Sequence, residues 1–75
     1  MTLETLLKVA YKKVNEHAGE EEAAKLLLME LSGYDPHQFY MAMKDEVNDD
    51  LKNTFLDKLD QYLIKHIPVQ HLIGH

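Results

Sequence analysis

The residues of this chain best suited to bind a metal ion are its histidines, and three of the five stand close together at the C-terminal end. His71 follows His66 by five residues and His75 follows His71 by four, and an i, i+4 pair on a helix can share a metal ion. Pro68 and Gly74 interrupt these spacings, and the stretch contains no Asp or Glu to complete a site. The sequence therefore predicts no metal centre. A small zinc-binding bundle built on these three histidines is the least favoured hypothesis.

Nucleophilic catalysis has even less support. The chain contains no cysteine, and its single serine, Ser32, stands beside Gly33 where a helix is expected to end. The three glycines are far apart, so the chain has no Gly-rich loop of the kind that binds phosphate groups. We therefore predict no catalytic residue in this chain.

Four acidic residues cluster near the middle of the sequence: Asp45, Glu46, Asp49 and Asp50. A calcium loop needs alternating oxygen ligands, a glycine turn and a closing glutamate, and this order is missing here. The favoured interpretation is a helix start, where carboxylates suit the positive end of the helix dipole, beside a solvated loop. The alternative is a surface for a basic partner.

The charge balance narrows the class of partner. Eight lysines and no arginine oppose thirteen acidic residues, which gives a formal net charge of -5. Nucleic-acid binding depends on cations set against phosphates, and that pattern is missing. No apolar run approaches the roughly 18 residues of a membrane span, and the first residues lack the basic region of a signal peptide. We expect a cytoplasmic chain that binds neither nucleic acid nor a membrane.

Apolar residues at helical spacing, separated by capping and breaking residues, predict one small all-α domain: a bundle of four helices plus a short C-terminal helix. No sustained alternation or hairpin turn indicates a strand. Short connections favour antiparallel neighbours. The expected helices run from Thr2 to about His17, from Glu20 to Ser32, from Asp35 to about Met43, from Asn48 over roughly 19 residues to Ile67, and from Pro68 to Gly74.

The second of these helices carries the widest apolar face, so we expect it to be the most buried. Tyr34, His37 and Tyr40 are candidates for an outward patch that recognises a partner, because tyrosines suit surfaces that are partly apolar and partly wet. The predicted core consists of Leu7, Val14, Leu27, Leu31, Phe39, Phe55, Leu59 and Leu63.

Four segments of the sequence resemble a known domain. The stretch from Glu22 to Leu28, closing at Gly33, the run from Pro36 to Tyr40 and the long helix from Asn48 resemble successive helices of the HemK/PrmC N-terminal domain. That family comprises the protein-(glutamine-N5) methyltransferases of peptide chain release factors.

The closing segment is the most specific match. Here Pro68, Leu72 and Gly74 fall in step with the family motif GEPxxYLxG, while His71 replaces the usual Tyr and Ile67 stands where the family often has an acidic residue. The resemblance covers essentially the whole chain.

The resemblance implies a helical domain that helps to bind and orient the release factor. An S-adenosylmethionine-dependent domain then methylates the Gln of the factor's Gly-Gly-Gln motif. The family's catalytic Asn-Pro-Pro-Tyr motif cannot occur here, because Pro36 and Pro68 are not adjacent. We therefore expect a fragment that holds no cofactor itself, S-adenosylmethionine belonging to the catalytic domain of the parent chain. Pro68, Gln70 and His71 are expected near the junction with that domain.

The small size of the domain is consistent with this expectation. A small bundle cannot enclose both a cofactor and a substrate, but it can supply binding energy away from the reacting atoms. Its acidic surface would suit a basic stretch of a protein substrate. The alternative is a free-standing helical interaction module with no catalytic role.

Overall fold

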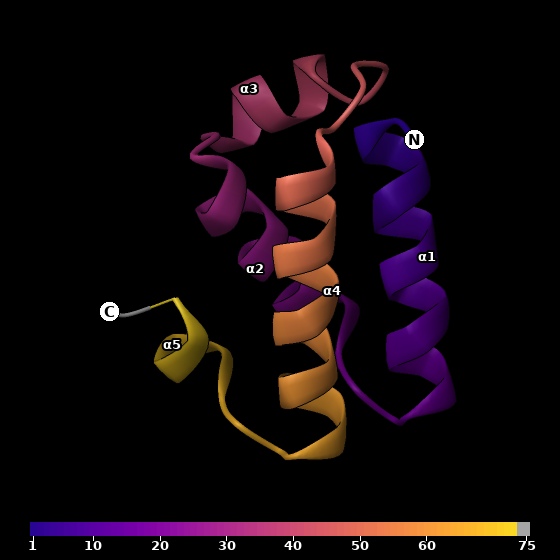
Figure 1. Ribbon diagram of the computed structural model, residues 1–75, viewed down its shortest axis with the longest axis vertical. Helices are drawn as coiled ribbons and strands as arrows, with labels where there is room; N and C mark the ends of the chain where they lie inside the picture. Colours follow the sequence, from indigo (N-terminus) through magenta and orange to yellow (C-terminus); the bar gives the residue numbers. More distant parts are fainter. Residues whose placement is uncertain (74–75) are drawn as a thin grey trace.

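Five helices make up the structure, a computed structural model that describes residues 1–73 of the chain (Figure 1). The all-α prediction is confirmed, and the only strand-like pairing in these residues is an isolated bridge between Thr2 and Glu46. None of the helices in this range is long and apolar enough to cross a membrane. The helices are α1 (Leu3–Glu16), α2 (Glu21–Ser32), α3 (Pro36–Met41), α4 (Asp49–Ile64) and α5 (Val69–Leu72).

The three long helices pack together in pairs, and α5 rests on α2 and α4. In Figure 1, α1 and α4 run in the same direction and α2 runs against both. Helix α3 lies across one end of the bundle, between the end of α2 and the start of α4, while α5 lies near the opposite end. In this view α3 and α5 lie to the left of α4 and α1 lies to its right, while α2 begins behind α4 and packs against both α1 and α4.

Capping residues begin three of the helices as predicted. Thr2, Asp35 and Asn48 each accept a hydrogen bond from a backbone N–H in the first turn of the following helix. Asp35 forms a complete capping box, because Gln38 also accepts a hydrogen bond from the Asp35 N–H at 3.1 Å. These bonds satisfy N–H groups that have no partner inside the helix, which is why local sequence alone locates the starts.

The end of α4 differs from the prediction. A helix of roughly 19 residues was expected from the position of Pro68, but α4 has 16 residues and ends at Ile64. His66 adopts a left-handed backbone conformation with φ of 58°, and the Ile67 N–H donates back to the Gln61 carbonyl. The chain therefore leaves the helix axis before the proline is reached.

Helices α1 and α2 both close with a bond that spans five residues. Gly19 N–H donates to the Val14 carbonyl and Tyr34 N–H to the Met29 carbonyl, the pattern of a Schellman motif. Gly33, which stands where the second helix is expected to end, supplies the left-handed residue after α2, with φ of 78°. After α1 the left-handed residue is Ala18, with φ of 57°.

We expect Ala18→Gly to raise the free energy of unfolding by about 0.5–1 kcal/mol, because glycine adopts positive φ without the Cβ penalty. Gly33→Ala is the matched control. A Cβ there would meet open space, so the expected loss has a conformational cause alone. Urea unfolding of both variants measures the effect; a loss of stability in Ala18→Gly would contradict it.

The core lies between α1, α2 and α4, and α3 and α5 add to it. Seven of the eight predicted core residues are buried, but Leu31 is only half-buried. The expectation that the second helix is the most buried is also wrong, because α1 buries five side chains and α2 buries three. The apolar face of α2 is wider than its neighbours can cover, which leaves part of that face for another contact.

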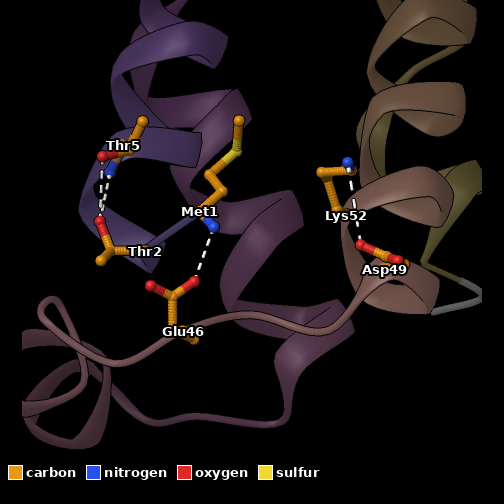
Figure 2. Close-up of polar contacts among 6 residues, drawn as sticks. All are labelled: Met1, Thr2, Thr5, Glu46, Asp49 and Lys52. Atoms are coloured by element: carbon orange, nitrogen blue, oxygen red, sulfur yellow. Dashed lines mark hydrogen bonds and ion pairs between the residues drawn. The ribbon is translucent and has the colours of Figure 1, made fainter.

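The predicted polar connection between α3 and α4 is pinned to the start of the chain. Leu3 N–H donates to the Asp45 carbonyl and Val47 N–H to the Met1 carbonyl, each at 3.0 Å. The Met1 amino group also lies 2.6 Å from a carboxylate oxygen of Glu46 (Figure 2). These contacts hold the loop that carries Asp45 and Glu46 against the first turn of α1, whereas Asp49 and Asp50 stand in the first turn of α4.

Glu4 forms two ion pairs close to this contact between the loop and α1. Its carboxylate lies 3.1 Å from the Lys44 ammonium and 3.4 Å from that of Lys8, and these two lysines hold the pKa of Glu4 below its usual value. A lowered pKa in the folded state adds stability above the unfolded pKa and loses it as the pH falls.

We therefore expect Glu4→Gln to melt at a slightly lower temperature than the unaltered chain at pH 7. The difference should shrink as the pH is lowered from 7 to a value below the lowered pKa of Glu4 in the folded state, and it should also shrink in high salt. Melting curves at the two pH values measure it. A difference that persists at the lower pH would show a cause other than the charge.

Candidate functional site

The interior of the domain offers no chemistry. Every buried side chain among residues 1–73 is apolar, and no buried polar atom in that range lacks a hydrogen-bond partner. A catalytic group or cofactor contact needs a polar atom held in a protected cavity. The polar and charged side chains of these residues all lie at least partly at the surface.

One surface candidate is the outward face of α3. Phe39 and Ala42 anchor this short helix in the core, whereas Tyr40 is 74% exposed and Met41 is 67% exposed. His37 is exposed as well, and its spacing from Tyr40 and Met41 places all three on one side of the helix. We call His37, Tyr40 and Met41 the α3 patch.

Tyr34, the remaining predicted recognition residue, stands in the turn that leads from α2 into α3 and is 38% exposed. All three predicted recognition residues thus lie at the α3 end of the bundle, and their role in binding stays a prediction. Met41 was not among them, although its place in the helix, one residue after Tyr40, could have indicated it.

The second candidate is an open groove of about 510 Å³ between α2 and the segment that enters α5. Half-buried Leu26 and Met29 line it from α2, and Val69 lines it from α5. Pro36 at the start of α3 and Tyr62 of α4 also line it. We call it the α2–α5 groove; it occupies the part of the α2 apolar face that the core leaves uncovered.

Two of the three predicted junction residues, Pro68 and Gln70, line this groove. His71 is exposed and does not line it. The position of α5 is fixed by the buried side chains of Val69 and Leu72 and by the Lys58 ammonium, which donates to the Leu72 carbonyl at 3.1 Å. The side of the groove formed by α5 is therefore held in place by packing and by this hydrogen bond.

The charges around the groove are mainly acidic. Glu20 and Glu22 line it, and within residues 1–73 neither side chain has a hydrogen bond or an ion pair. Glu21 between them accepts a hydrogen bond from Asn15 at 2.9 Å. Lys25 is the cation of the groove. Burial raises the pKa of the nearby Tyr11, and the charges of Glu21 and Glu22 raise it further.

The histidines do not form a metal centre in the described part of the chain. No three His, Asp or Glu side chains gather there, and His75 lies outside that part. His17 and His66 line a second hollow of about 430 Å³ where α1 and α4 end. His71 is separate from them on α5.

The sequence does not predict the groove, because its α2 wall and its α5 wall are more than 30 residues apart along the chain. Its single local signal was the width of the α2 apolar face, where Leu26 and Met29 extend the stripe formed by Leu27 and Leu28. The width of this face predicts that α2 is the most buried helix. It instead marks a surface that the bundle leaves open.

The five helices and their apolar interior define a small all-α domain. Comparison with protein families makes this specific: the family described as the PrmC N-terminal domain matches residues 5–74. The chain belongs to that family, as its closing segment indicated. No curated protein and no solved structure gives a significant match.

Proposed function

We propose that this domain helps to bind and orient a peptide chain release factor for methylation of the Gln in its Gly-Gly-Gln motif. The observation that carries the proposal is the family match across residues 5–74. Methyl transfer from S-adenosylmethionine is assigned to a catalytic domain of the same protein. The described residues do not suit that cofactor, because they bury no polar side chain and the chain has no Gly-rich loop.

The proposed role is a contribution of binding energy. Contacts far from the reacting amide can lower the barrier if they hold that amide in the geometry of the transition state. Tyrosine and methionine supply adaptable apolar contacts, so the α3 patch is a suitable first contact for a protein substrate. The net charge of -5 would favour approach of a basic region of that substrate.

A titration tests the proposal. The chain, labelled with nitrogen-15, is titrated with a bacterial class I release factor, and the amide signals are followed. We expect shifts confined to one face, beginning with the α3 patch. No shift at millimolar concentration would show that the domain does not bind the factor by itself, and the proposed recognition role would fail.

A further inference from the structure

The α2–α5 groove is apolar along its floor. Leu26 and Met29 are half-buried, so they pack against the core on one side and face the groove on the other. Val69 is 5% exposed and closes the floor from α5. An apolar side chain placed here would remove these surfaces from water, which favours binding.

The charged residues at the rim of the groove, Glu20, Glu22 and Lys25, favour a basic occupant. Glu20 and Glu22 lack partners within residues 1–73, so both carboxylates are available to a ligand. Their charges exceed that of Lys25, and Glu21 stands next to them in the sequence. The N-terminal end of α2 offsets only part of this negative charge. A basic group gains by approaching this rim, whereas an acidic one is repelled.

We infer that the α2–α5 groove is the docking site for a basic, amphipathic segment of the protein substrate. An apolar side chain of that segment lies against Leu26, Met29 and Val69, and a neighbouring lysine or arginine faces Glu20 and Glu22. This assignment rests on the proposed function, since it names where on the domain the substrate is held.

The size and position of the groove fit such an occupant. A volume of about 510 Å³ accommodates one or two large side chains of a peptide. Pro36, the first residue of α3, forms part of the wall, so the groove adjoins the helix that carries the α3 patch. A substrate could contact both surfaces at once.

Opposite charges at one position give the sharpest test. Gln70 is exposed and lines the groove, so Gln70→Glu and Gln70→Lys change its charge by one unit in each direction without disturbing the core. With a class I release factor as the probe, we expect Gln70→Glu to lower Kd by about two- to fivefold and Gln70→Lys to raise it by a similar factor. The two values should converge in about 1 M salt.

The signals of the Met29 methyl group and the Val69 amide report contact with the floor and should shift on binding. Binding of the factor without these shifts, or with equal Kd for the two variants, would overturn the groove assignment and leave the proposed function intact. Failure of the unaltered chain to bind the factor would remove the proposed function, and the groove assignment with it.

Discussion

Phe55→Ala is expected to remove about 3–5 kcal/mol from the free energy of unfolding, because it empties the volume of a large, fully buried ring. Phe55 is 0% exposed and belongs to the cluster that α1, α2 and α4 share. A chain of this length has a total stability of only about 4–11 kcal/mol. The variant should therefore melt about 12–40 °C lower, or be unfolded at room temperature.

The matched control lies two and a half turns further along the same helix. Ile64 is 62% exposed, so Ile64→Ala removes a large apolar side chain of α4 that the core does not use. Its melting temperature should change by no more than a few degrees, since surface substitutions usually stay within about 0.5 kcal/mol. Circular dichroism melting of both variants makes the comparison. Equal losses would mean that α4 faces the core differently from the structure described here.

Tyr40→Ala is expected to weaken binding to a class I release factor by about tenfold or more without destabilising the domain. Exposed tyrosines are among the residues on which binding energy concentrates, and truncating such a residue commonly costs more than 1 kcal/mol. The Tyr40 hydroxyl has no hydrogen-bond partner within residues 1–73 and the residue is 74% exposed, so the fold does not depend on its ring. Alanine also has the higher helix propensity.

Calorimetric titration of the factor into both chains measures the change in Kd. Ile64→Ala again serves as the control, because Ile64 is similarly exposed but lies at the end of α4 away from α3 (Figure 1). Its Kd should equal that of the unaltered chain. An unchanged Kd in Tyr40→Ala would remove the α3 patch from the binding surface, and a loss in Ile64→Ala would place the contact elsewhere.

The starts of the helices were predictable because their causes are local. Asp35 and Asn48 each satisfy an N–H group three residues further along the chain, so the signal and its effect lie in the same short window. The end of α2 was predictable for the same reason, since Gly33 adopts a positive φ at little cost.

The end of α4 was not predictable in this way. His66 adopts the left-handed conformation without being a glycine, and the cost is offset by tertiary contacts that the sequence does not display. Val69 and Leu72, which enter the core, require the chain to turn back over α2 and α4 at this point. Pro68 predicts a later end of α4, because a proline restricts only the backbone of the residue before it.

The two candidate surfaces also differ in whether their cause is local or tertiary. The α3 patch could be anticipated, because a short helix with one large buried residue, Phe39, must expose its remaining large residues. The groove could not, because it depends on how α5 lies against α2. Half-buried Leu31 belongs to the same class of error, since periodicity places a residue on a face without showing how much of that face is covered.

The proposed role of this domain is to supply binding energy for the intact protein substrate without chemistry of its own. The test uses a release-factor methyltransferase that carries the domain, compared with the same enzyme without it. For each form, kcat/KM is measured with the whole factor and with a short peptide containing Gly-Gly-Gln. Removing the domain should lower kcat/KM for the factor by about tenfold or more and leave the value for the peptide within about twofold. Equal losses for both substrates, or no loss for the factor, would contradict the account.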